Sequence, residues 1–216
     1  MILSLGNVFL KKNQSKKWWI KAHVSDEYVK QSKALGYRSR ASFKLLEIQE
    51  KDHIIKYGMN VVDLGATPGG WSEAAVKIVG EKGSVYALDL LPLEPIPDVI
   101  YIQGDFTDDA IYEKVLEYSQ SKKIELVMSD MSPNLSGIKD VDQAKIMYLA
   151  ELVLDFSKIV LVPGGSMLVK LFQGEGIDDF YRDVRKCFKS VKTRKPKASR
   201  PKSREIYLLA KDYFVS

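Results

Sequence analysis

Four side chains capable of acid–base chemistry stand far apart in the sequence: Lys44, Asp130, Lys170 and Glu205. We expect three of them at strand ends and the fourth, Lys44, on a helix that leads into the core. That arrangement can gather two cations and two carboxylates over one cleft. Such a group of side chains is suited to activating and positioning an alcohol.

Lys170 is the candidate general base. It ends a predicted strand within the apolar run of residues 167–172, and partial burial disfavours a charged ammonium group. A neighbouring Lys44 would act in the same direction. Asp130 would favour the ammonium form, so we assign it to orienting Lys170 and the reacting hydroxyl. His53 follows a helix among charged residues, as a surface histidine would.

A glycine-rich loop, residues 65–70 with the sequence GATPGG, follows the first predicted strand. In an open α/β sheet this position lies at the ligand-binding edge, where glycines let a ligand approach the backbone. Pro68 suits a turn or a helix start. The spacing Gly-x-x-x-Gly-Gly does not match the Gly-x-Gly-x-x-Gly pattern of dinucleotide binding, which disfavours a nicotinamide oxidoreductase.

An acidic residue stands at the end of each of the first three predicted strands. Asp63 would oppose a pyrophosphate but suits the ammonium and sulfonium of S-adenosylmethionine. Asp89 can accept hydrogen bonds from ribose hydroxyls, and Asp105 can accept one from an adenine amine with Phe106 against the ring. Each alone could be a helix cap or a solvated loop residue, but the three together predict a cofactor site. The predicted cofactor-binding residues are Asp63, Gly65, Pro68, Gly69, Gly70, Trp71, Asp89, Asp105, Phe106 and Asp130.

The elements that must position these residues alternate along the chain. Short β-branched runs and helical segments predict a mostly parallel α/β sheet with helices on both faces. Strands are expected at residues 60–64, 84–88, 99–103, 125–129 and 166–171, and helices at 71–79, 108–119, 142–160 and 177–188. Residues 163–165, Pro-Gly-Gly, should stop the third helix before the fifth strand. Residues 190–195 and 204–210 predict an antiparallel hairpin at the far edge of the sheet.

Five segments in one order resemble the FtsJ (RrmJ) family of ribosomal RNA 2'-O-methyltransferases. They are RSRASFK (38–44), DLGATPGGW (63–71), MSDMSPN (128–134), LVKLFQGEG (168–176) and SREIY (203–207). The resemblance implies the Rossmann-like fold of S-adenosylmethionine-dependent methyltransferases and a Lys44–Asp130–Lys170–Glu205 catalytic tetrad. It also implies S-adenosylmethionine as cofactor, S-adenosylhomocysteine as product, and ribosomal RNA of the large subunit as substrate, with a uridine of the A loop as acceptor.

The net charge of +5 is concentrated in two clusters. Five lysines within residues 11–21 surround Trp18 and Trp19, and residues 182–204 carry eleven cations against the single acid Asp183. Basic clusters that include stacking-capable indoles indicate nucleic-acid binding. The predicted RNA-binding residues are Lys16, Lys17, Trp18, Trp19, Arg38, Arg40, Lys192, Arg194, Lys195, Lys197 and Arg200.

The 216 residues suffice for one globular domain, with 45% hydrophobic and 28% charged residues. We expect residues 1–24 to form a basic, aromatic extension and residues 25–216 a single methyltransferase domain. The apolar stretch 148–162 is interrupted by charges, and residues 1–10 lack the features of a secretory signal, so a cytoplasmic protein without membrane contact is expected. Cys187 and two histidines cannot form a Cys/His zinc site, and neither a metal nor an obligate protein partner is expected.

Other functions remain open at this point. A transfer RNA or messenger RNA cap 2'-O-methyltransferase could use the same tetrad, and a ribosome-assembly factor could keep the fold without catalysis. Methylation of a base amino group commonly uses an Asp/Asn-Pro-Pro-aromatic motif, whereas residues 130–133 here are Asp-Met-Ser-Pro. Methylation at pyrimidine carbon 5 needs a nucleophilic cysteine, and Cys187 lies outside the motifs.

Overall fold

The computed structural model describes residues 27–106, 108–121, 123–200 and 202–214 of the chain. The predicted N-terminal extension, residues 1–24, lies outside this range, and so do Lys16, Lys17, Trp18 and Trp19. The division of the chain into extension and domain therefore stays a prediction.

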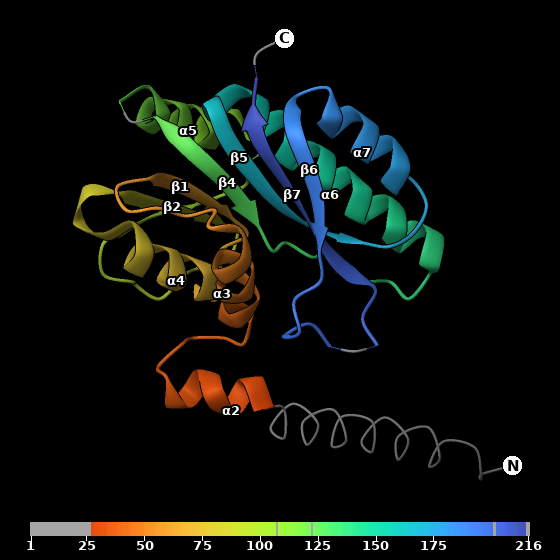
Figure 1. Ribbon diagram of the computed structural model, residues 1–216, viewed down its shortest axis with the longest axis horizontal. Helices are drawn as coiled ribbons and strands as arrows, with labels where there is room; N and C mark the ends of the chain where they lie inside the picture. Colours follow the sequence, from red (N-terminus) through yellow and green to blue (C-terminus); the bar gives the residue numbers. More distant parts are fainter. Residues whose placement is uncertain (1–26, 107, 122, 201, 215–216) are drawn as a thin grey trace, which may run out of the picture.

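The described strands form one mixed sheet with the order β3-β2-β1-β4-β5-β7-β6 (Figure 1). Strands β1 to β5 run parallel, and β7 pairs antiparallel with both β5 and β6. The strands are β1 (Asn60–Leu64), β2 (Ser84–Asp89), β3 (Val99–Gln103), β4 (Ile124–Ser129), β5 (Leu161–Phe172), β6 (Phe188–Arg194) and β7 (Glu205–Tyr213). This confirms the predicted parallel sheet with an antiparallel hairpin at its C-terminal side.

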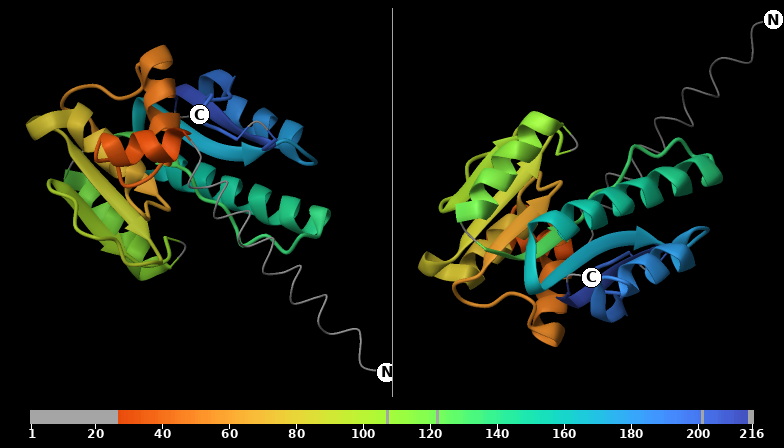
Figure 2. Two further views of the ribbon diagram at one scale, coloured as in Figure 1. Left: turned by 90° about the horizontal axis from the view of Figure 1, so that it is seen from below. Right: turned by 90° about the horizontal axis from the view of Figure 1, so that it is seen from above.

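Helices cover both faces of the sheet (Figures 1 and 2). The helical segments are α2 (Glu27–Ala34), α3 (Ala41–Asp52), α4 (Gly70–Val79), the short η1 (Gly80–Lys82), α5 (Asp109–Ser121), α6 (Lys139–Val160) and α7 (Ile177–Arg185). Helices α3 and α4 pack on one face, while α5, α6 and α7 pack on the other. No helix in this part of the chain is long and apolar enough to span a membrane.

The central strands are apolar on both sides because both faces are covered. In β4, Leu126 packs with the α3 and α4 cluster, whereas its neighbour Val127 packs with the α5 to α7 cluster. Leu168 and Val169 divide in the same way in β5. Successive side chains of a strand point to opposite faces, so a continuous apolar run is what a doubly covered sheet requires.

Two predicted boundaries need correction. Helix α6 ends at Val160, and the Pro-Gly-Gly segment, residues 163–165, lies inside β5. The register with β4 shifts there, and Gly164 has φ +85°, so the segment forms an irregularity in the strand and not a linker before it. The last predicted helix stops at Arg185, because Phe188 is buried and opens β6, where its ring packs on that of Tyr213.

Candidate active site and cofactor cleft

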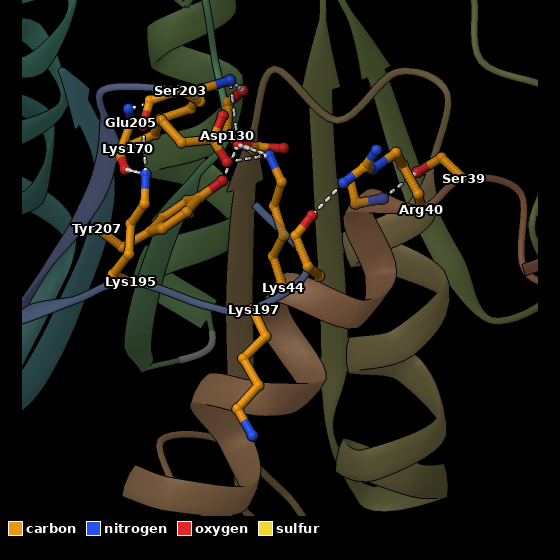
Figure 3. A network of polar contacts seen from close by, with 12 residues as sticks. Ser39, Arg40, Lys44, Asp130, Lys170, Lys195, Lys197, Ser203, Glu205 and Tyr207 are labelled. Carbon is orange, nitrogen blue, oxygen red and sulfur yellow. Dashed lines mark hydrogen bonds and ion pairs between the residues drawn. The ribbon is translucent and has the colours of Figure 1, made fainter. Parts of the chain in front are cut away.

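The four predicted catalytic residues meet at the carboxyl ends of the parallel strands (Figure 3). Asp130 Oδ1 lies 3.3 Å from Lys170 Nζ and 3.9 Å from Lys44 Nζ. Lys44 Nζ lies 2.8 Å from Glu205 Oε1, and Lys170 Nζ donates to the Asp130 carbonyl oxygen at 3.2 Å. Asp130 is therefore shared between the two lysines.

The sheet topology explains why these residues meet. Strands β4 and β5 are parallel neighbours, so Asp130 and Lys170, at the carboxyl ends of these strands, lie at the same end of the sheet. Strand β7 runs antiparallel to β5 and pairs its first residue, Glu205, with Phe172, so Glu205 lies at that end of the sheet as well. Lys44 extends from the buried face of α3, which also carries Leu45 and Ile48.

The cluster is largely shielded from solvent. The side chains of Lys44 and Lys170 are each 10% exposed, that of Glu205 is 11% exposed and that of Asp130 17%. Burial alone would raise the pKa of Glu205, but the positive charge and hydrogen bonding of Lys44 outweigh it, and the pKa of Glu205 lies below its ordinary value. Glu205 therefore stays a carboxylate and holds the Lys44 ammonium in place.

Tyr207 is a member of the cluster that the sequence analysis missed. Its hydroxyl donates to Asp130 Oδ1 at 2.6 Å, and its ring centroid lies 5.6 Å from Lys44 Nζ. Burial, together with the charges of Asp130 and Glu205, raises the pKa of Tyr207 well above its ordinary value, so the hydroxyl remains a donor. The signal was present in SREIY, because Glu205 and Tyr207 are two positions apart on a strand and share one face.

A cleft of about 780 Å³ opens beside the cluster, along the carboxyl ends of the parallel strands. Five of the predicted cofactor residues line it, namely Gly65, Asp89, Asp105, Phe106 and Asp130. Asp130 therefore borders both the cleft and the lysine pair. A ligand in the cleft would reach the cluster of predicted catalytic residues at Asp130.

Asp89 and Phe106 are held firmly in the cleft wall. The two carboxylate oxygens of Asp89 accept hydrogen bonds from the backbone N–H groups of Thr67 and Leu91, each at 2.8 Å. Each oxygen keeps a second lone pair for a ligand hydroxyl. Phe106 packs edge-to-face on Phe156 with a centroid distance of 6.2 Å, and Asp105 beside it is exposed.

The other predicted cofactor residues do not line the cleft. Pro68, Gly69 and Gly70 form the turn into α4, and Gly69 has φ +104°. Trp71 is buried, with its indole N–H donating to the Ala41 carbonyl oxygen at 2.8 Å. Any contact of Gly70 or Trp71 with a cofactor would come from the backbone N–H groups that the first turn of α4 leaves without helical partners.

Asp63 lies behind the cleft wall. The residue is 1% exposed, and its carboxylate accepts a hydrogen bond from the Ser72 hydroxyl at 2.6 Å. Burial raises the pKa of Asp63 to about 7, and the negative charges of Asp130 and Asp89 add to this effect. The predicted direct contact with a ligand cation does not fit this position.

Gly65, which lines the cleft, is also required by the packing of the protein itself. Its φ is +74°, and a Cβ atom added there would lie 2.1 Å from the side chain of Met131. Both the backbone conformation and the packing of Met131 therefore require glycine.

Several predicted RNA-binding cations are engaged within the protein. The Arg38 guanidinium donates to the carbonyl oxygens of Glu94 and Pro95 at 2.7 and 2.6 Å, which ties down the connection between β2 and β3. Arg194 makes two hydrogen bonds of 2.5 Å to the Asp52 carboxylate. Both guanidinium groups therefore hold parts of the fold, and their contact with RNA stays a prediction.

Arg40 and Lys195 are engaged in the same way. Arg40 donates to the Ala198 carbonyl oxygen, and Lys195 donates to the carbonyl oxygens of Ser203 and Glu205. Lys192, Lys197 and Arg200 are exposed, as are Arg38 and Lys195, and RNA contact by the predicted cations stays a prediction.

Known proteins match almost the whole chain. The FtsJ-like methyltransferase family matches residues 37–213. The ribosomal RNA large subunit methyltransferase E of Alkalilimnicola ehrlichii is 54% identical over 203 residues, which are 94% of this chain and 97% of the relative. The protein of the same name from Pseudomonas aeruginosa is 52% identical over 195 residues, which are 90% of this chain and 94% of the relative.

Solved structures agree with the fold. A Plasmodium falciparum crystal structure, described as that of a ribosomal RNA methyltransferase, has a TM-score of 0.75 and 29% identity, and the match covers 83% of this chain and 100% of that one. The fibrillarin/Nop5p complex contains a chain with a TM-score of 0.53 and 18% identity, with 79% and 81% coverage, which supports the fold alone. Together with the family match over residues 37–213, these findings confirm the resemblance seen in the five sequence motifs: the chain belongs to the FtsJ-like methyltransferase family.

Proposed function

We propose that the protein transfers a methyl group from S-adenosylmethionine to a ribose 2'-hydroxyl of large-subunit ribosomal RNA, in the cytoplasm. The relatives named ribosomal RNA large subunit methyltransferase E support the choice of RNA. The observation that carries the reaction is the buried cluster of two lysines and two carboxylates, whose Asp130 also borders the cleft. A uridine of the A loop is the acceptor that family resemblance favours.

The cleft suits S-adenosylmethionine, which supplies an electrophilic methyl group on a sulfonium. Its volume of about 780 Å³ is in the range of small-molecule sites. Asp89 would accept from the ribose hydroxyls, and Asp105 with Phe106 would hold the adenine. The carboxylate of Asp130 at the inner end favours a cationic ligand group nearby.

Lys170 is the proposed general base. A neutral lysine amine has two N–H donors and one lone pair. It can keep both of its contacts with Asp130, the 3.3 Å approach to Oδ1 and the 3.2 Å hydrogen bond to the carbonyl oxygen, and direct the lone pair at a substrate hydroxyl. After proton transfer the ammonium is held by the same carboxylate. Methyl transfer depends mainly on alignment, so a base fixed by two contacts is an advantage.

Lys44, Glu205 and Tyr207 position the reacting groups. Glu205 fixes the Lys44 ammonium at 2.8 Å, and Tyr207 fixes Asp130 at 2.6 Å. Lys44 is then free to donate its remaining N–H bonds to the ribose oxygens, because an ammonium has three donors. Exposed Lys192, Lys197 and Arg200 would contact RNA phosphates, and binding should therefore weaken steeply with salt.

The experiment supplies labelled S-adenosylmethionine with ribosomal subunits, naked ribosomal RNA and transfer RNA from cells that lack the enzyme. The product is then hydrolysed with alkali. A 2'-O-methyl group blocks cleavage at its own linkage, so the label should appear in an alkali-resistant dinucleotide from large-subunit RNA. Label on an ordinary mononucleotide would mean base methylation and overturn the reaction. Resistant label found only in transfer RNA would replace the substrate.

A further inference from the structure

We propose that Glu47 is a positioning residue that holds the loop between β6 and β7, of which the structure describes residues 195–200 and 202–204, in the conformation in which it binds RNA. The proposal rests on the proposed function, since it concerns how the RNA is bound. Glu47 lies on α3, one helical turn after Lys44, and belongs to none of the motifs that carry the chemistry.

The contact is a two-point clamp on consecutive peptide groups. Glu47 Oε2 accepts from the backbone N–H of Lys197 at 2.6 Å, and Glu47 Oε1 accepts from that of Ala198 at 2.8 Å. Arg40, the residue immediately before α3, donates to the carbonyl oxygen of the same Ala198. Hydrogen bonds to a charged acceptor are shorter and stronger than neutral ones, so this clamp fixes both position and orientation of the loop backbone.

The clamp separates the loop into an inner and an outer side. Ala198 is fully buried and Ser199 is 4% exposed, whereas Lys197 and Arg200 on either side are exposed. Figure 3 shows the Lys197 side chain pointing away from the catalytic cluster. Anchoring the backbone at Lys197 and Ala198 therefore presents cations to the outside at fixed positions, as phosphate contacts require.

The loop is also tied to the catalytic cluster. Lys195 donates to the carbonyl oxygens of Ser203 and Glu205 at the other end of the loop (Figure 3). Glu205 in turn pairs with Lys44 on the helix that carries Glu47. Helix α3 thus contacts both the loop backbone, through Glu47, and the cluster, through Lys44.

The negative charge of Glu47 lets the effect of charge on RNA affinity be distinguished from the effect of positioning. A carboxylate beside a basic RNA-binding loop repels phosphate, so its neutralisation should tighten RNA binding if charge alone mattered. A positioning role predicts the opposite, because glutamine keeps only one acceptor oxygen and releases one of the two peptide groups. Glu50, exposed on the same helix, is the matched control for the change in charge.

The experiment compares Glu47→Gln with Glu50→Gln in the full chain. We expect Glu47→Gln to raise KM for the RNA about tenfold, with kcat at saturating RNA and S-adenosylmethionine affinity within about twofold of wild type. The slope of log K against log salt should become shallower by about 0.7 for each phosphate of single-stranded RNA that the loop no longer neutralises. Glu50→Gln should leave the slope unchanged and bind RNA equally or more tightly.

Glu47→Asp separates position from charge, since it keeps the carboxylate but withdraws it by one methylene. It should share the defect in KM, and it takes the place of Glu47→Gln if that variant does not fold. If either Glu47 variant binds RNA as tightly as Glu50→Gln does, the inference is wrong. The wild-type protein is tested alongside to separate the role of Glu47 from the proposed function. A wild type that fails to methylate the subunit overturns the proposed function itself.

Discussion

Asp63 should make the stability of the protein depend on pH. Its buried carboxyl has a pKa of about 7 against an ordinary value of 3.8, so between these values the folded protein binds more protons than the unfolded chain. Stability must then fall as pH rises through this window, because the unfolded chain releases the Asp63 proton while the folded protein, with this carboxyl buried near the charges of Asp130 and Asp89, retains it. At about 1.36 kcal/mol for each pH unit, the whole effect is about 4 kcal/mol.

The perturbation is Asp63→Asn, which keeps the shape and can still accept the hydrogen bond from Ser72. The difference in unfolding free energy between variant and wild type isolates the contribution of Asp63, since all other titrating groups cancel. We expect the variant to gain about 2 kcal/mol relative to wild type between about pH 5 and about pH 6.5. Above about pH 7.5 the difference should level off.

Urea unfolding curves for the two proteins at half-unit pH intervals measure this difference. Equal slopes for both proteins in urea are required, because a change in slope would mean that the variant alters the unfolded state. Two stability curves that run parallel across this range would refute the reasoning, since they would show that Asp63 ionises alike in the folded and unfolded chains.

Three further predictions concern the site and its support. Lys170→Arg should lose most single-turnover methyl transfer while keeping S-adenosylmethionine affinity, since arginine stays protonated and cannot act as base; a near-native rate would remove Lys170 from that role. Asp89→Ala should weaken S-adenosylmethionine binding by about 1 to 3 kcal/mol in calorimetry, and unchanged binding would place the ribose elsewhere. Asp52→Ala should cost about 3 kcal/mol in urea unfolding, because it leaves the Arg194 guanidinium, 16% exposed, without its carboxylate; a cost below about 1 kcal/mol would class the pair with surface ion pairs.

The strands were predictable because a sheet that is covered on both faces requires continuous apolar runs in the sequence. For the same reason the sequence could not say which way Asp63 points, since β1 is buried on both sides. The tetrad could be assembled in advance only through family resemblance, because the contacts between Lys44 and Glu205 depend on tertiary structure.

The partners of charged side chains were the least predictable part of the site. A sequence shows a cluster of cations but not the carbonyl or carboxylate that each one meets. Arg194 pairs with Asp52, and Arg38 donates to the Glu94 and Pro95 carbonyl oxygens, so two guanidinium groups expected to bind RNA have a structural role that the sequence did not show. Tyr207 was overlooked because a tyrosine in a strand usually packs in the core, which it also does here.

The place of β7 in the sheet makes the polar cluster depend on the pairing of this strand with β5. This strand lies between β5 and β6 and contributes both Glu205 and Tyr207, while the other members of the cluster come from elements earlier in the chain. A translation product that stops before residue 205 would leave Lys44 and Asp130 without these partners and the edge of β5 open for aggregation. All residues that line the cleft precede β7 in the sequence, so the cluster is completed only after the chain has supplied the whole cleft.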